Sequence, residues 1–250
     1  MNLKKNPTVA IIGLGYVGLP LLHLLSRKNM SVLGFDIDSN KISKLKNNLS
    51  YISDLNNKDI KIINKKKLYK MKDLSKIRLA DFIILCLPTP LTKNIKPDLS
   101  IIKNVFNKIK NFLKNDQTLI LESTVYPGAT NKIFYNFVNK NFCIGKNFFY
   151  GYSSERISPG QTGKNLFLKF ENIPKVVSGF DKNSLKKIST FYKKVFKKVY
   201  PAQSIEVAEM SKLVENSYRS VNIGLVNELK IVCDILNINI VNDQFFLFLF

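Results

Sequence analysis

Three closely spaced glycines follow a short apolar run near the start of the sequence. Residues 9–12 are Val, Ala, Ile and Ile, and they lead into Gly13, Gly15 and Gly18, after which leucines recur at helical spacing. This order predicts a strand, a tight turn and a helix. In such a unit the first glycine allows the turn, the second lets the backbone approach a pyrophosphate, and the third lets the helix pack closely on the strand. The helix N-terminus then offers N–H groups to the anion.

A carboxylate stands where a dinucleotide site needs one. The run 31–35 predicts a second strand, and Asp36 follows it, 18 residues after Gly18. A carboxylate there accepts hydrogen bonds from both ribose hydroxyls and repels a 2′-phosphate, so we predict NAD and not NADP as the cofactor. The next predicted helix, 39–49, has Ser39 as its N-cap. Its Lys41 either reaches an adenosine phosphate or is solvated.

Polar side chains also follow three later predicted strands, 80–87, 118–122 and 148–152. Ligands of parallel sheets bind beyond the carboxyl ends of the strands, so we expect these side chains to face a cofactor or a substrate. For Glu155 and Arg156, which follow the third of these strands, the alternative is an ion pair on the surface. We interpret Cys86, inside the first of these strands, as a core residue. The polar residues concerned are Thr89, Thr124, Glu155 and Arg156.

One long helix is predicted over 204–236, because apolar residues recur there at steps of three and four. Such a helix would run about 50 Å, which suits a connector between domains or a dimer interface. Lys212 and Asn216 are four residues apart and share one face of it, and Arg219 lies near the next turn. A lysine and an amide facing one pocket can stabilise an oxyanion without a metal. A solvated lysine is the alternative.

The elements that position these residues alternate between strand and helix. This order predicts an α/β fold, a Rossmann-like doubly wound, mostly parallel sheet followed by a long connecting helix. We expect three regions: an NAD-binding domain at 1–200, the long helix at 201–238 and an atypical tail at 239–250. Residues 51–76 are rich in Lys and Asn with poor periodicity, so we interpret them as a surface excursion.

Composition narrows the class of protein. The chain has 250 residues, 45% of them hydrophobic, with no apolar run long enough to span a membrane and no apolar signal core at the N-terminus. Three cysteines without metal-type spacing suit a reducing compartment, so we predict a cytoplasmic protein without a metal site. The net charge of +21 comes almost wholly from scattered lysines. Without a nucleic-acid-binding motif, we expect no specific nucleic-acid binding and only weak, salt-sensitive association.

Six ordered motifs together resemble one family, the UDP-glucose/GDP-mannose dehydrogenases, which are nucleotide-sugar 6-dehydrogenases. The resemblance runs from about residue 8 to residue 236 and is nearest to the UDP-N-acetylhexosamine branch, used in surface polysaccharide synthesis. The motifs are V-A-I-I-G-L-G-Y-V-G-L-P, G-F-D-I-D, L-C-L-P-T-P, E-S-T-V-Y-P-G-A-T, G-Y-S-S-E-R-I-S-P-G and E-V-A-E-M-S-K-L-V-E-N-S-Y-R-S-V-N-I-G-L-V-N-E-L.

The resemblance implies an activity and a role for each matching position. Members oxidise the C6 alcohol of the sugar to a carboxylate with two NAD and release no aldehyde. Catalytic roles fall on Thr124, Glu155, Lys212 and Asn216, with Glu155 contacting substrate or assisting a hydrolytic water. Further substrate contacts are Arg156 and Arg219. The positions implied for the cofactor are Gly13, Gly15, Tyr16, Val17, Gly18, Asp36, Lys41, Thr89 and Thr124.

The sequence departs from the family after the long helix. Members carry a cysteine in a G-G-H-C stretch that forms a thiohemiacetal and then a thioester, and this sequence has no such stretch. Its last residues, V-N-D-Q-F-F-L-F-L-F, match nothing in the family. We therefore expect a truncated or frame-shifted product or a fragment, in which the second oxidation fails. None of Cys86, Cys143 and Cys233 stands at a position that could substitute.

Two other functions stay open on the sequence. One is a non-catalytic NAD-binding fragment that forms a homodimer through the long helix. The other is a β-hydroxyacid dehydrogenase, because those enzymes also follow a Rossmann domain with a helix carrying Lys and Asn four residues apart. The stretches around Thr124 and Glu155 favour a UDP-sugar substrate instead.

Overall fold

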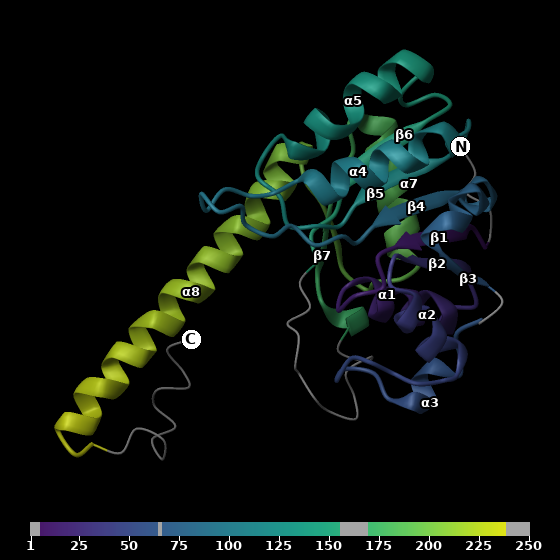
Figure 1. The fold of residues 1–250 in the computed structure, drawn as a ribbon. Coiled ribbons are helices and arrows are strands. Elements are labelled where there is room, and N and C mark those ends of the chain that lie inside the picture. The colour runs from purple at the N-terminus through teal and green to yellow at the C-terminus, as the bar shows by residue number, and fades with distance from the viewer. Residues whose placement is uncertain (1–5, 65–66, 156–169, 239–250) are drawn as a thin grey trace. The chain divides into compact units, whose positions relative to one another are not determined.

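A computed structural model describes residues 6–64, 67–155 and 170–238 of the chain (Figure 1). The chain divides into two compact units, Met1–Met210 and Ser211–Phe250. Each unit is described by itself below.

A six-stranded parallel sheet forms the centre of the first unit, in the order β3-β2-β1-β4-β5-β6. Chain order reverses between β1 and β4, where Val9 pairs with Phe82. The strands are β1 (Thr8–Ile12), β2 (Ser31–Asp36), β3 (Leu68–Lys70), β4 (Phe82–Leu85), β5 (Thr118–Leu121) and β6 (Phe149–Tyr152). A separate parallel pair is formed by β7 (Lys175–Val177) and β8 (Val199–Pro201).

Helices pack on both faces of the main sheet, which confirms the predicted doubly wound α/β fold (Figure 1). The described helices are α1 (Gly18–Arg27), α2 (Ser39–Lys46), α3 (Asn57–Ile60), η2 (Met71–Leu79), α4 (Ser100–Ile109), η3 (Lys110–Phe112), α5 (Ala129–Asn141), α7 (Lys182–Lys193) and α8 (Ile205–Ile235).

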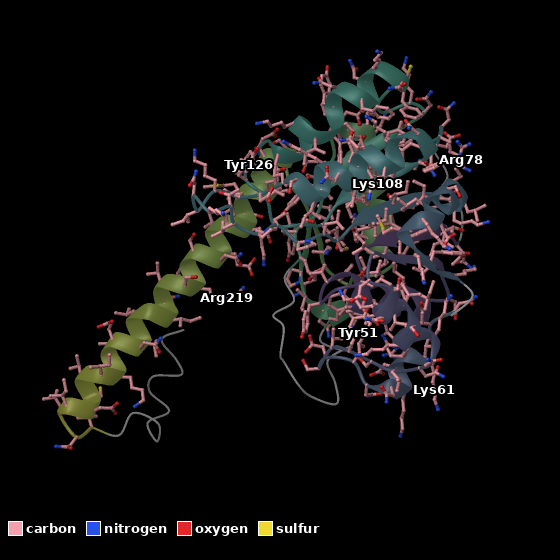
Figure 2. The ribbon with its side chains drawn as sticks, viewed as in Figure 1. Tyr51, Lys61, Arg78, Lys108, Tyr126 and Arg219 are labelled. Carbon is pink, nitrogen blue, oxygen red and sulfur yellow. The ribbon has the colours of Figure 1, made fainter. Side chains whose placement is uncertain are left out.

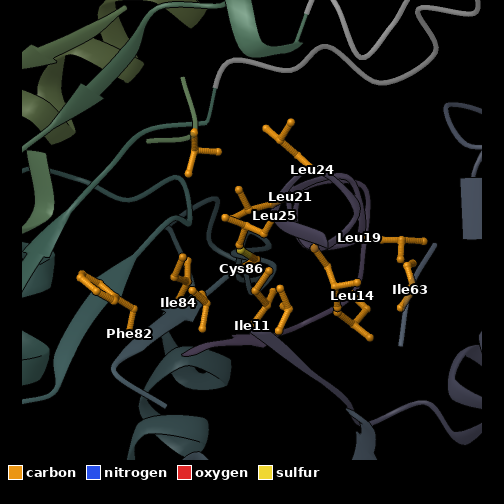
Figure 3. Packing of buried hydrophobic residues seen from close by; sticks show 14 of the residues in the cluster. Ile11, Leu14, Leu19, Leu21, Leu24, Leu25, Ile63, Phe82, Ile84 and Cys86 are labelled. Atoms are coloured by element: carbon orange, nitrogen blue, oxygen red, sulfur yellow. The ribbon is translucent and has the colours of Figure 1, made fainter. Parts of the chain in front are cut away.

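Strand alternation divides the core into two layers. Val9 and Ile11 of β1 pack with α1 and α7, whereas Ala10 and Ile12 pack with α4 and α5. Figure 3 shows the first layer, where leucines of α1 gather over Ile11, Ile84 and Cys86. Both faces of the strands are covered, so polar groups of the sheet can reach a ligand only at its ends.

The start of α8, up to Met210, belongs to this unit. The Glu209 carboxylate accepts hydrogen bonds from the N–H groups of Gly128 (2.5 Å) and Thr130 (2.9 Å) and from the Thr130 hydroxyl (2.7 Å). Gly128 is the N-cap of α5 and has no side chain to cap the helix with, so Glu209 supplies the missing acceptor from a distant part of the chain. Ile205 and Ala208 are buried in the layer that contains α4 and α5.

The expectation of a surface excursion over 51–76 is wrong. This segment forms α3, edge strand β3 and η2, and it buries Ile52, Leu55, Ile60, Ile63, Leu68 and Leu74. These buried residues are hard to recognise among the many lysines and asparagines of the segment. They belong to several short elements, so they do not recur with the period of one helix or one strand. Two boundaries also differ from expectation: Asp38, not Ser39, caps α2, and Cys86 follows β4 as a buried residue.

Basic side chains lie on the outside of the first unit. Lys61, Arg78 and Lys108 are exposed and come from the end of α3, from η2 and from α4 (Figure 2). This distribution over different elements agrees with the scattered lysines of the sequence. In the second unit, α8 continues to Ile235 with exposed apolar residues, among them Val214, Val221 and Leu225. No helix among the described residues is long and apolar enough to cross a membrane.

His23 gives the fold a pH-dependent stability. Its side chain, on α1, is fully buried, and this burial lowers its pKa from 6.5 to about 4. The charge of Asp59 opposes this shift and the charge of Arg27 adds to it. The unfolded chain therefore binds more protons than the folded chain between about pH 6.5 and pH 4. Stability from this group is complete above that window and is lost as the pH falls through it.

The variant His23→Leu should remove this acid sensitivity. Between pH 7 and pH 4 we expect the free energy of unfolding of the unchanged protein to fall by roughly 2–3 kcal/mol relative to that of the variant. Denaturant titrations at several pH values measure the difference. Parallel pH profiles for the two proteins would show that His23 is not held neutral in the fold.

A strained residue lies at the tip of a short hairpin at 91–97. The N–H of Thr92 donates to the Lys96 carbonyl (2.8 Å), and Ile95 has φ 57° with a side chain that is 79% exposed. A β-branched residue is costly in this left-handed region, and Ile95 makes no compensating burial. We expect Ile95→Gly to raise the free energy of unfolding by about 1 kcal/mol. Ile95→Ala removes the β-branch but keeps a Cβ, so it should give a smaller gain in the same measurement.

Candidate functional site

The glycine turn lies at the switch point of the sheet, between the carboxyl ends of β1 and β4. Gly13 has φ 93°, and a Cβ on it would come within 2.3 Å of the Cys86 carbonyl oxygen. A Cβ on Gly18 would lie 1.9 Å from the Gly13 carbonyl oxygen. At Gly15, by contrast, a Cβ would meet nothing within 4 Å. The first and third glycines are thus needed for packing, and the second borders open space, as a site for a pyrophosphate requires.

The start of α1 completes this anion site. Val17 is its N-cap and forms no side-chain capping bond, so the first N–H groups of α1 receive no side-chain acceptor from it. Tyr16 is 48% exposed beside them. The structure therefore places the predicted residues Tyr16 and Val17 in the same turn as the three glycines.

Asp36 lies buried at the end of β2, next to this turn. Its Oδ2 accepts a hydrogen bond from the N–H of Leu14 and its Oδ1 accepts one from the N–H of Asp38, both at 2.8 Å. Lys41 Nζ lies 3.8 Å from Asp36 Oδ2. The sequence analysis expected Lys41 either to reach an adenosine phosphate or to be solvated, and it did not predict this ion pair. The first turn of α2 makes the pair possible, because it brings the lysine back toward β2.

Sequence reasoning missed Tyr51. Its hydroxyl donates to the Leu14 carbonyl oxygen at 2.6 Å, and Lys41 Nζ lies 5.8 Å from the centre of its ring. Burial, with Asp36 and Asp38 adding to it, raises the pKa of Tyr51, so the hydroxyl stays a donor. Tyr51 thereby fixes the backbone between Gly13 and Gly15. A tyrosine in a polar stretch carries no sequence signal for this contact.

Thr89 and Thr124 are brought together beyond β4 and β5. The Thr89 hydroxyl donates to the Thr124 carbonyl oxygen at 2.7 Å, and the N–H of Leu87 donates to Ser123 Oγ at 3.0 Å. These bonds join the two loops that leave neighbouring strands. Both threonines therefore lie at the same edge of the sheet as the glycine turn, where the sequence predicted them.

Glu155 lies in a buried charge cluster and not in a surface ion pair. Lys175 Nζ is 2.9 Å from Glu155 Oε2 and 3.2 Å from Glu122 Oε1, and all three side chains are buried. The Tyr192 hydroxyl donates to Glu122 Oε1. Arg156, predicted next to Glu155, lies outside the described residues. The sequence analysis did not predict a role for Glu122 or Lys175. Glu122 directly follows β5 and Lys175 begins β7, and a charged residue at the border of a buried strand is the signal that could have identified them.

Burial and the charges of neighbouring groups shift the pKa values of Glu122 and Lys175. Burial raises the pKa of Glu122, with the Glu155 charge adding to it and Lys175 opposing it. Burial alone would lower the pKa of Lys175, but the two carboxylates raise it above its ordinary value. Lys175 is therefore a cation at neutral pH.

The remaining predicted residues belong to the second unit. Lys212 and Asn216 lie four residues apart on α8, as the sequence predicted. Arg219 forms an ion pair with Glu215 one turn away (2.8 Å). Among the residues that the structure describes, no group of three or more His, Cys, Asp or Glu side chains could hold a metal ion.

A parallel sheet with a glycine turn at its switch point and a carboxylate at the end of the second strand defines a dinucleotide-binding domain of the dehydrogenase type. Two matches narrow this class. Residues 7–199 match the NAD binding domain of the UDP-glucose/GDP-mannose dehydrogenase family, and residues 206–242 match its central domain. The chain belongs to this family of NAD-dependent dehydrogenases, and NAD is the cofactor of its first unit.

Similar curated proteins support the assignment to this family. Protein CapL from Staphylococcus aureus is 40% identical over 237 residues, which are 94% of this chain and 54% of the relative. The UDP-N-acetyl-D-glucosamine 6-dehydrogenase of Salmonella typhi is 34% identical, over 92% of this chain and 53% of its own length. The chain thus spans about half the length of the curated relatives it matches.

Solved structures agree with these relatives. A UDP-D-ManNAc dehydrogenase from Pyrococcus horikoshii gives a TM-score of 0.81 at 26% identity, covering 93% of this chain and 55% of its own. The UDP-N-acetyl-mannosamine dehydrogenase Cap5O from Staphylococcus aureus gives 0.75 at 29% identity, covering 94% and 57%. The 3-hydroxyisobutyrate dehydrogenase of Mycobacterium tuberculosis, at 13% identity and a TM-score of 0.64, shares the fold alone.

The different surroundings of Gly15 and Gly18 predict that the same substitution affects NAD binding at Gly15 and stability at Gly18. Gly15→Ala should leave the free energy of unfolding within about 1 kcal/mol and weaken NAD binding at least about tenfold, because its methyl group enters the space next to the pyrophosphate. Gly18→Ala should destabilise the fold by several times as much, because its methyl group meets backbone. Calorimetric NAD titration and denaturant unfolding of both variants measure the two effects. Equal loss of stability in both would contradict this division of roles.

Proposed function

We propose that the chain is the NAD-binding part of a nucleotide-sugar 6-dehydrogenase that oxidises the C6 alcohol of a UDP-N-acetylhexosamine to the uronate. The observation that carries the proposal is the edge of the sheet where the glycine turn, Asp36 and the Thr89–Thr124 pair meet. The printed activities of the relatives, UDP-N-acetyl-D-glucosamine 6-dehydrogenase and UDP-N-acetyl-D-mannosamine dehydrogenase, supply the substrate class.

The described residues fit the cofactor. The open space at Gly15 and the start of α1 suit a pyrophosphate, and the buried carboxylate of Asp36 suits the hydroxyls of the adenosine ribose. Bound NAD supplies the hydride acceptor. We assign Thr89 and Thr124 to the nicotinamide side, because they lie beyond the strands that continue the sheet past its switch point.

We assign five further residues to the sugar substrate. The Lys212 ammonium and the Asn216 amide share one face of α8 and would stabilise the oxyanion that develops at the reacting carbon. Glu155 would contact the substrate or orient water, and Arg156 and Arg219 would bind the substrate. Thr124 would act between cofactor and substrate.

We also propose a homodimer through α8. Val214, Tyr218, Val221, Leu225, Val232 and Ile235 recur at steps of three, four or seven along the helix, and all are exposed. An apolar stripe with this period is typical of a helix that packs on another. A cytoplasmic location and the absence of specific nucleic-acid partners stay predictions.

A non-catalytic NAD-binding protein is the second candidate, favoured by the match of the NAD binding domain model to residues 7–199, which lie within the first unit alone. The 250-residue chain, incubated with NAD and UDP-N-acetylglucosamine or UDP-N-acetylmannosamine, separates the two. NADH and uronate, with two NADH for each sugar, would establish the dehydrogenase. NAD binding without NADH would favour the non-catalytic protein, and NADH from a small hydroxy acid instead would indicate a β-hydroxyacid dehydrogenase.

Asp36→Asn tests the cofactor site independently of turnover. The amide keeps the shape of the carboxylate but loses its charge and one of the two acceptors for the N–H groups of Leu14 and Asp38, so we expect NAD binding to weaken by about 1–3 kcal/mol. Binding of NADP should weaken less or improve, because the repulsion of its 2′-phosphate is removed. Calorimetric titration with both dinucleotides gives the ratio, which a general loss of folding would not change. An unchanged ratio would place the adenosine ribose elsewhere.

A further inference from the structure

Tyr51 contacts the middle of the glycine turn from a distant segment, and the proposed function gives it no part. Its hydroxyl donates to the Leu14 carbonyl oxygen at 2.6 Å, across 37 positions of the sequence. The segment that carries Tyr51 is itself fixed, because the N–H of Ser50 donates to Asn57 Oδ1 (2.8 Å) and Ile52 is buried. The hydroxyl therefore reaches the turn from a defined position.

The two peptide groups that flank Leu14 are held by different side chains. The N–H of Leu14, in the peptide that follows Gly13, donates to Asp36 Oδ2 at 2.8 Å. The carbonyl of Leu14, in the peptide that precedes Gly15, accepts from Tyr51. Tyr51 packs against the core layer that contains α1, and the Leu14 side chain lies in the same layer (Figure 3). The Leu14 carbonyl is thus turned toward Tyr51 and this layer.

Peptide geometry then sets the direction of the next N–H group. The Leu14–Gly15 peptide is trans, and in a planar trans peptide the N–H points away from the carbonyl oxygen. The N–H of Gly15 therefore points away from Tyr51. It forms no hydrogen bond within the part of the chain that the structure describes, and a Cβ on Gly15 would meet nothing within 4 Å. This N–H is left for a ligand.

The glycine at position 15 makes the reverse orientation of this peptide accessible. Gly15 does not have a positive φ here, but a half-turn of the Leu14–Gly15 peptide would change its φ, and glycine accepts either sign at little cost. The Leu14 carbonyl oxygen would then take the place of the N–H and repel a phosphate. Anion sites of this kind need N–H groups that point at the ligand. Without the bond from Tyr51, the two orientations would compete.

We propose that Tyr51 is a positioning residue that holds the Leu14–Gly15 peptide with its N–H, and not its carbonyl, toward the pyrophosphate of the dinucleotide. When the hydroxyl is lost, only a fraction of the protein keeps the binding-competent turn, and the affinity falls by that fraction. The inference rests on the cofactor site of the proposed function and does not depend on the sugar substrate.

Tyr51→Phe removes the hydroxyl alone and tests this role in the full 250-residue chain. We expect the variant to bind NAD and ADP-ribose, which both contain the pyrophosphate, about three- to tenfold more weakly than the unchanged protein. Adenosine, which lacks the pyrophosphate, should bind equally to both proteins. Titrations followed by NMR give the three affinities. Equal weakening for adenosine, or unchanged affinity for all three ligands, would overturn the proposal.

Tyr150→Phe is the matched control for the loss of a hydroxyl group. The Tyr150 hydroxyl donates to Asn131 Oδ1 of α5 at 3.0 Å and makes no contact with the glycine turn. This variant should bind all three ligands as the unchanged protein does. Weakening of NAD by the same factor in both variants would show that Tyr51 acts through general stability and would overturn the proposal.

The amide resonance of Gly15 tests the orientation of the peptide without a dinucleotide. In the unliganded Tyr51→Phe variant, we expect NMR relaxation dispersion to show exchange of this amide between two states, which should be absent from Tyr150→Phe. A single state in Tyr51→Phe would overturn the inference. If Tyr51→Phe does not fold, the unchanged protein still decides: saturating NAD should move the Gly15 amide resonance downfield, and an unmoved resonance would contradict the proposal.

The outcomes distinguish this inference from the proposed function. A chain that behaves as expected in these titrations but does not oxidise a UDP-sugar would contradict only the proposed function. A chain that oxidises a UDP-sugar, and whose Tyr51→Phe variant binds NAD with unchanged affinity, would contradict only the inference.

Discussion

Backbone contact at the glycine turn is the constraint on which the rest of the first unit depends. The Gly13 carbonyl fills the space where a side chain of Gly18 would stand, and the Cys86 carbonyl does the same at Gly13. This contact brings the start of α1 up to the ends of β1 and β4. Because α1 is then packed against the sheet by its leucines, its N–H groups and Asp36 face one small region. A dinucleotide site follows from that packing.

Two groups of buried charged side chains near the ends of the strands are stabilised in different ways. At the end of β2, backbone N–H groups stabilise the Asp36 carboxylate. Beyond β5 and β6, a side-chain ammonium stabilises two carboxylates that reach it from different strands. Backbone donors are fixed by the fold itself, whereas the second arrangement depends on which side chains the sequence supplies. The buried carboxylate at the end of β2 and the buried charges beyond β5 and β6 are thus held by different kinds of interaction.

The sequence was sufficient for features that depend on local order. Gly13, Gly15, Gly18 and Asp36 could be predicted because a strand, a turn and a helix succeed one another without a long insertion. Thr89 and Thr124 could be predicted to share an edge because parallel strands end on the same side. The bridge from Lys175 to Glu122 could not, since it joins residues far apart in the chain whose apolar neighbours suggest only core. The prediction for residues 51–76 was wrong for another reason. Lysines are so frequent there that the few buried side chains of its short elements form no recognisable pattern.

The bonds of Glu209 carry a consequence for how the chain can be divided. A protein cut at residue 200, where the alternation of strands and helices stops, would lose the acceptor of three hydrogen bonds at the start of α5 and the buried side chains of Ile205 and Ala208. The N–H groups of α5 would then face solvent next to an uncovered apolar surface. An independently expressed NAD-binding domain therefore has to extend past Glu209, into the second turn of α8, so the start of this helix is part of that domain's own architecture.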